Sequence, residues 1–77
     1  MNPLLEETME GAHGALAMGD MAAAATLYRK ATEIDPTYAA AFNNLAIAYD
    51  HEGNLEKARG AYDRAIADFD QAIRLEP

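Results

Sequence analysis

A chain of 77 residues with a net charge of −7 and no cysteine is confined to a few classes of protein. It has room for one small core but for no disulfide and no cysteine-ligated zinc site, and its acidity disfavours nucleic acid, because phosphate binding needs a basic face. No apolar run approaches the roughly 20 residues of a membrane helix, and the acidic N-terminus does not resemble a secretory signal peptide. We therefore expect a cytoplasmic protein with no membrane partner.

The first half of the chain predicts two helices. Asn2 can cap a helix over residues 3–18, and Pro3 suits its first turn. Gly19 and Asp20 then form a break, because glycine accepts the left-handed conformation at a helix end and aspartate caps the next helix. The second helix is expected over residues 21–34.

The second half repeats this plan. Pro36 disfavours helical geometry at the residue before it, and Thr37 is a candidate cap for a third helix over residues 38–51. Gly53 and Asn54 then precede a fourth helix over residues 55–75. Connections this short make neighbouring helices antiparallel, so we predict an all-α fold.

Six positions of the first half recur 34 residues later. The pairs are Gly19 and Gly53, Asp20 and Asn54, Ala24 and Ala58, Tyr28 and Tyr62, Lys30 and Arg64, and Ala31 and Ala65. A 34-residue period is typical of a helix–turn–helix repeat, the unit that stacks into a helical solenoid.

The same positions resemble the tetratricopeptide repeat (TPR) family. The second unit reads Phe42-x2-Leu45-Ala46-x2-Tyr49 and then Ala58-x3-Tyr62-x2-Ala65, which is similar to the family pattern W-x2-L-G-x2-Y and A-x3-F. The first unit matches in its second helix, Ala24-x3-Tyr28-x2-Ala31, and closes with Pro36, whereas its first helix departs from the pattern. The resemblance implies one domain over residues 1–77, a short solenoid with repeats over about 3–36 and 37–77.

The last helix departs from the family pattern by seven extra residues. The segment Tyr62 to Ile66 is echoed by Phe69 to Ile73, and seven residues are about two helical turns, so the apolar face is lengthened. The turn of the last pair could lie at Gly53 or at Gly60. The apolar face could cap the solenoid or could form a self-association stripe of Tyr62, Ile66, Phe69 and Ile73.

The resemblance also implies where a ligand would bind. In TPR proteins the first helices of successive repeats line a concave groove that binds peptides. By register, this peptide-binding groove would comprise Met9, His13, Asn43, Asn44, Ile47 and Asp50. Because the first 27 residues carry no Lys or Arg, we expect the protein or peptide partner to be neutral or basic.

Catalysis is not expected from this composition. The chain has no serine or cysteine nucleophile and no glycine-rich phosphate loop, and His13 and His51 lack the spacing of a zinc-protease helix. We therefore predict a non-enzymatic protein–protein interaction module with no cofactor and no metal. The alternatives are an assembly unit that forms a homo-oligomer through its last helix, or a designed or excised repeat fragment without independent function.

Overall fold

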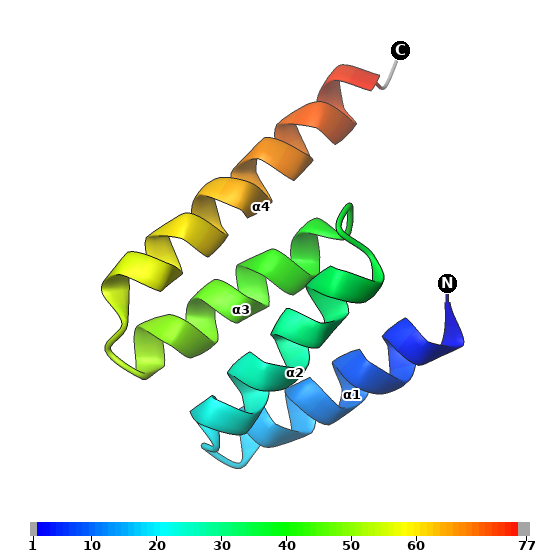
Figure 1. Ribbon diagram of the computed structural model, residues 1–77. Helices are drawn as coiled ribbons and strands as arrows, with labels where there is room; N and C mark the ends of the chain where they lie inside the picture. Colours follow the sequence, from blue (N-terminus) through cyan, green and yellow to red (C-terminus); the bar gives the residue numbers. More distant parts are fainter. Residues whose placement is uncertain (1, 76–77) are drawn as a thin grey trace.

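The computed structural model describes the backbone of residues 2–75 and the side chains of residues 2–70. Four α-helices follow one another: α1 Pro3–Ala17, α2 Met21–Ile34, α3 Ala39–His51 and α4 Leu55–Leu75. Each packs against the helix before it, and neighbours run in opposite directions (Figure 1). The predicted all-α stack of helix–turn–helix pairs is confirmed.

The same turn closes both helix pairs. Gly19 and Gly53 adopt φ angles of 80° and 81°, in the left-handed region that favours glycine. The amide of the next residue, Asp20 or Asn54, donates a hydrogen bond of 2.9 Å to the carbonyl five residues earlier. The side chains of Asp20 and Asn54 then accept from the amide three residues later, at 3.1 and 3.3 Å. The turn of the second pair therefore lies at Gly53, and Gly60 is inside α4.

The connection between the pairs differs from the prediction in one detail. Tyr38, without a side-chain hydrogen bond, is the cap of α3, so Thr37 does not cap that helix. Instead, the amide and hydroxyl of Thr37 donate to Oδ1 of Asp35, at 3.0 and 2.6 Å. This local turn satisfies Thr37 within the loop and leaves the helix to begin one residue later than predicted.

Small residues dominate the core, which lets the helices approach closely. Among residues 2–70, six alanines have no exposed surface: Ala12, Ala24, Ala31, Ala41, Ala46 and Ala48. Tyr28 is also fully buried and is the largest such side chain, whereas its counterpart Tyr62 is half-buried against the core. The alanine expected at the second helix crossing, Ala58, is 3% exposed.

The long last helix projects beyond its neighbours. α4 has 21 residues and α3 has 13, so α3 covers only part of its length. Figure 1 shows the C-terminal half of α4 passing the α2–α3 turn and extending away from the other helices.

Candidate functional site

Four of the predicted groove residues share one side of α3. Asn43, Ile47 and Asp50 are spaced by four and three residues, and Asn44 lies beside them, so they form a stripe that we call the α3 stripe. Both asparagines and Ile47 are half-buried, and Asp50 is exposed. Among the described residues, no hydrogen bond uses the side-chain amide of either asparagine. These amides are accessible donors and acceptors next to an apolar side chain.

The two groove residues predicted on α1 are placed differently. Met9 is only 6% exposed and belongs to the core, since it lies on the side of α1 occupied by Leu5 and Ala12. Its assignment to the binding surface is therefore wrong for this structure. His13 is exposed, but its Nδ1 lies 2.5 Å from the hydroxyl of Tyr28, with the rings edge to face at 5.5 Å. His13 thus links α1 to α2 and has one ring nitrogen already engaged.

A pocket that the sequence analysis did not predict lies between α2, α3 and α4. Its volume is about 410 Å³, within the range of roughly 300–1,000 Å³ seen for ligand sites. We call it the central pocket. Its walls combine apolar residues with three cations: Phe42, Leu45, Tyr49, Gly60, Ala61, Arg29, Lys57 and Arg64.

The cations of the central pocket are placed by their helices and by aromatic rings. Lys57, Gly60 and Arg64 are spaced by three and four residues, so they share one face of α4. The Lys57 ammonium lies 5.6 Å from the ring centre of Tyr49, and the Arg64 guanidinium lies 5.0 Å from that of Phe42. This spacing is visible in the sequence, but the approach of Arg29 from α2 is not.

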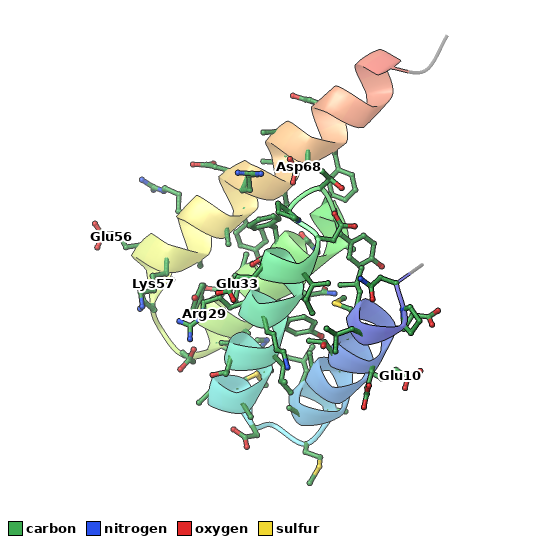
Figure 2. The ribbon with its side chains drawn as sticks, turned by 45° about the vertical axis from the view of Figure 1, so that its right-hand side comes forward. Glu10, Arg29, Glu33, Glu56, Lys57 and Asp68 are labelled. Atoms are coloured by element: carbon green, nitrogen blue, oxygen red, sulfur yellow. The ribbon has the colours of Figure 1, made fainter. Side chains whose placement is uncertain are left out.

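Among the described residues, Arg64 makes an ion pair, whereas Arg29 and Lys57 do not. Nε of Arg64 pairs with Asp68 at 3.3 Å, and its Nη2 donates to the carbonyl of Pro36 at 3.2 Å. That is the one ion pair within the described part of the chain, so neither Arg29 nor Lys57 has a carboxylate within 4.0 Å there. Figure 2 shows Arg29 and Lys57 on the same side of the molecule, and Glu10 of α1 on the other side.

The apolar stripe predicted on α4 divides into two parts. Tyr62 is half-buried against the core, whereas Ile66 is 58% exposed and Phe69 is 49% exposed. Ile73, the last member, lies outside the residues whose side chains are described. Because Ala65 beside them is buried, Ile66 and Phe69 lie on a face of α4 that the described residues leave exposed.

The described residues form neither a metal-binding cluster nor a membrane-spanning helix. They include no group of three or more His, Cys, Asp or Glu side chains arranged to hold a metal ion. In the same part of the chain, no helix combines the length and apolar character needed to cross a membrane.

Comparison with known families agrees with the geometry. Two family models described as tetratricopeptide repeat match the chain, one over residues 27–60 and one over residues 15–38. Together they span the last three residues of α1, the whole of α2 and α3, and the start of α4. No solved structure matches the chain.

Several similar proteins match this chain over part of their own sequence. The Photosystem I assembly protein Ycf3 of Rippkaea orientalis is 35% identical over 66 residues, as is that of Cyanophora paradoxa; each match covers 77% of this chain and 38% of the relative. A tetratricopeptide repeat and J domain-containing co-chaperone, DNJ1 of Cryptococcus neoformans, is 33% identical over 75 residues, which cover 97% of this chain and 13% of the relative. The chain therefore spans well under half the length of these relatives.

Proposed function

Because this chain is a tetratricopeptide repeat protein with two repeats, we propose that it is a protein-interaction module that binds a peptide or partner segment along the α3 stripe. A Photosystem I assembly protein and a J domain-containing co-chaperone are among its relatives, and a role in protein interaction fits both. No catalytic role is proposed for any residue.

The observation that carries this proposal is the pair of accessible amides on α3. Asn43 and Asn44 are half-buried, and no hydrogen bond among the described residues occupies their side chains. A carboxamide can donate to a peptide carbonyl and accept from a peptide amide, so two of them can hold an extended backbone. Ile47 adds an apolar contact one turn further along the same side of the helix.

The charge around the α3 stripe favours a neutral or basic ligand. Asp50 is exposed at the end of the stripe, and the chain as a whole carries a net charge of −7. A basic peptide is attracted to such a surface, whereas an acidic peptide is repelled. We therefore propose a partner segment with few or no carboxylates.

Peptide binding to the double variant Asn43→Ala, Asn44→Ala tests the proposal. The probe is a set of acetylated, amidated twelve-residue peptides with acidic, neutral or basic composition. We expect neutral or basic members to bind, and the double variant to weaken them about tenfold or more, because each lost hydrogen bond is worth roughly 0.5–1.5 kcal/mol. Thr26→Ala, an exposed polar-to-alanine change on α2, is the control. Equal affinity of wild type and double variant would refute this use of the α3 stripe.

A second candidate function rests on the exposed pair Ile66 and Phe69. Two apolar side chains at about half exposure on a projecting helix can be covered by a second copy of the chain, so we also propose self-association as the alternative. Solution mass by light scattering across a range of concentrations decides between them. A monomer at every concentration would remove this alternative and leave peptide binding.

A further inference from the structure

We infer that the central pocket is a second binding site, which takes an acidic segment of a partner protein that carries one aromatic or large aliphatic side chain. This site is distinct from the α3 stripe, and its preferred ligand has the opposite charge. The inference comes from the shape of the pocket, the charges at its edge and the absence of a side chain at Gly60.

The apolar lining of the pocket indicates that the ligand carries a large apolar side chain. Phe42, Leu45 and Tyr49 of α3 and Ala61 of α4 line a space of about 410 Å³. A space of this size, lined by aromatic and aliphatic groups, suits one large apolar side chain together with part of its backbone. Burying such a side chain supplies the non-directional part of the affinity.

The cations that line the pocket indicate that the ligand also carries carboxylates. Arg29, Lys57 and Arg64 are three of only six Lys and Arg residues in a chain of net charge −7, yet all three line this one pocket. Arg64 is already paired with Asp68, but Arg29 and Lys57 have no carboxylate within 4.0 Å among the described residues. The carboxylates of Glu33 and Glu56, on the same two helices, lie beyond that distance from both cations. Ligand carboxylates would therefore meet cations that are not neutralised by direct ion pairs.

Gly60 keeps this space open. It lies within α4, where it lines the pocket together with Lys57, Ala61 and Arg64, and a Cβ atom added to it would meet no atom within 4 Å apart from its chain neighbours and the local helix backbone. A larger side chain at this position would enter the pocket without a clash at Cβ. Glycine in the middle of a helix costs roughly 0.5–1 kcal/mol relative to alanine, so this residue weakens α4 while it preserves the cavity.

Filling the pocket gives the first test. Gly60→Leu places an apolar side chain in the space and improves helix propensity, so the variant should fold. Gly14→Leu is the matched control, because Gly14 is also an exposed helical glycine with no atom within 4 Å of an added Cβ, but lies in the last turn of α1. Both variants should unfold at the same or a higher temperature than the parent, which separates a loss of binding from a loss of folding.

Reversing the charges gives the second test. The double variant Arg29→Glu, Lys57→Glu removes the two cations that lack ion pairs. Its matched control is Lys30→Glu, Arg59→Glu, which makes the same change of net charge on the same two helices at exposed positions outside the pocket. A general effect of net charge would appear equally in both double variants.

The probe is the acetylated, amidated peptide Glu-Asp-Phe-Glu-Asp, titrated by isothermal calorimetry and by NMR chemical shifts. We expect it to bind, and the peptides Lys-Arg-Phe-Lys-Arg and Glu-Asp-Ala-Glu-Asp to bind at least tenfold more weakly. Gly60→Leu should weaken it at least tenfold and Arg29→Glu, Lys57→Glu at least fivefold, whereas both controls should stay within twofold of the parent. Failure of the acidic peptide to bind, or equal losses in the controls, would overturn the inference.

Two further outcomes distinguish binding in the central pocket from binding on the α3 stripe and from self-association of the chain. Asn43→Ala, Asn44→Ala should leave binding of the acidic peptide unchanged, and a tenfold loss there would overturn the inference by placing the peptide on the α3 stripe. If the parent forms an oligomer that Gly60→Leu converts to a monomer, the pocket holds a second copy of this chain, and the acidic partner is refuted.

Discussion

The hydroxyl of Tyr28 offers a stringent test of how the first helix pair is held together. Tyr28 has no exposed surface, and its hydroxyl is hydrogen-bonded to Nδ1 of His13 across the α1–α2 contact. The change Tyr28→Phe removes only the hydroxyl and leaves the buried ring in place. It therefore isolates the hydrogen bond from the packing of the aromatic ring.

The expected loss of stability is modest but measurable. A hydrogen bond of this kind contributes about 1 kcal/mol net, because folding exchanges it for a bond to water. For a domain of this size, a change of 1 kcal/mol corresponds to roughly 4–8 °C in the unfolding midpoint. We expect Tyr28→Phe to lower the midpoint by that amount near pH 7.

The effect of alkaline pH has a definite sign. Burial raises the pKa of Tyr28 above its ordinary value near 10. The unfolded chain therefore releases the phenol proton at a lower pH than the folded chain, and the stability linked to this group, complete below pH 10, is lost as pH rises through the folded pKa. In Tyr28→Phe this component of the alkaline loss should be absent.

Chemical denaturation followed by circular dichroism, repeated from pH 7 to pH 11, measures both effects. Tyr62→Phe is the matched control, because Tyr62 is the equivalent residue of the second repeat and its hydroxyl makes no hydrogen bond among the described residues. A double-mutant cycle with His13→Ala should give a coupling free energy of about 0.5 kcal/mol or more. A Tyr28→Phe variant as stable as the parent at pH 7, with the same loss above pH 10, would refute the reasoning.

Three further predictions follow from single positions. Gly53→Ala should lower the free energy of unfolding by roughly 1 kcal/mol, because its φ of 81° disfavours a Cβ, and thermal melts will show it. The hydrogen bonds from the hydroxyl and the amide of Thr37 lower the pKa of Asp35, so the parent should lose stability as pH falls through that lowered value, and Asp35→Asn should lose less in acid denaturation curves. If the chain self-associates, Ile66→Gln with Phe69→Gln should give a monomer by light scattering with the helix content retained, and an unchanged oligomer would exclude this pair as the interface.

The turns were predictable because their signals are local. A glycine followed by Asp or Asn predicts both a left-handed helix end and the cap of the next helix. Gly19 with Asp20 and Gly53 with Asn54 form this same turn. The position of the second turn, which the sequence pattern left open between Gly53 and Gly60, also has a local cause: the side chain of Asn54 accepts a capping hydrogen bond, and an alanine such as Ala61 has no side-chain acceptor. Thr37 was mispredicted because Asp35, two residues earlier, competed successfully for its hydroxyl and amide.

The surfaces were less predictable because they depend on how helices cross. Met9 falls at a groove position by register, but the side of α1 that faces α2 is set by packing that the sequence pattern does not contain. The central pocket likewise requires Arg29 of α2 to approach Lys57 of α4, and these residues are 28 positions apart. Residue spacing predicts which side chains share a face of one helix, but it does not predict which residues of two other helices pack beside that face.

The two proposed sites have opposite charge preferences, and this has a consequence for binding. Asp50 gives the α3 stripe an exposed carboxylate, whereas Arg29 and Lys57 give the central pocket positive charge. A basic peptide and an acidic peptide should therefore bind at the same time. In a titration of one peptide into protein saturated with the other, we expect the affinity to change by less than about threefold at an ionic strength where surface charges are screened beyond roughly 10 Å. Mutually exclusive binding would mean that one surface accepts both peptides, and the separation of the two sites would be wrong.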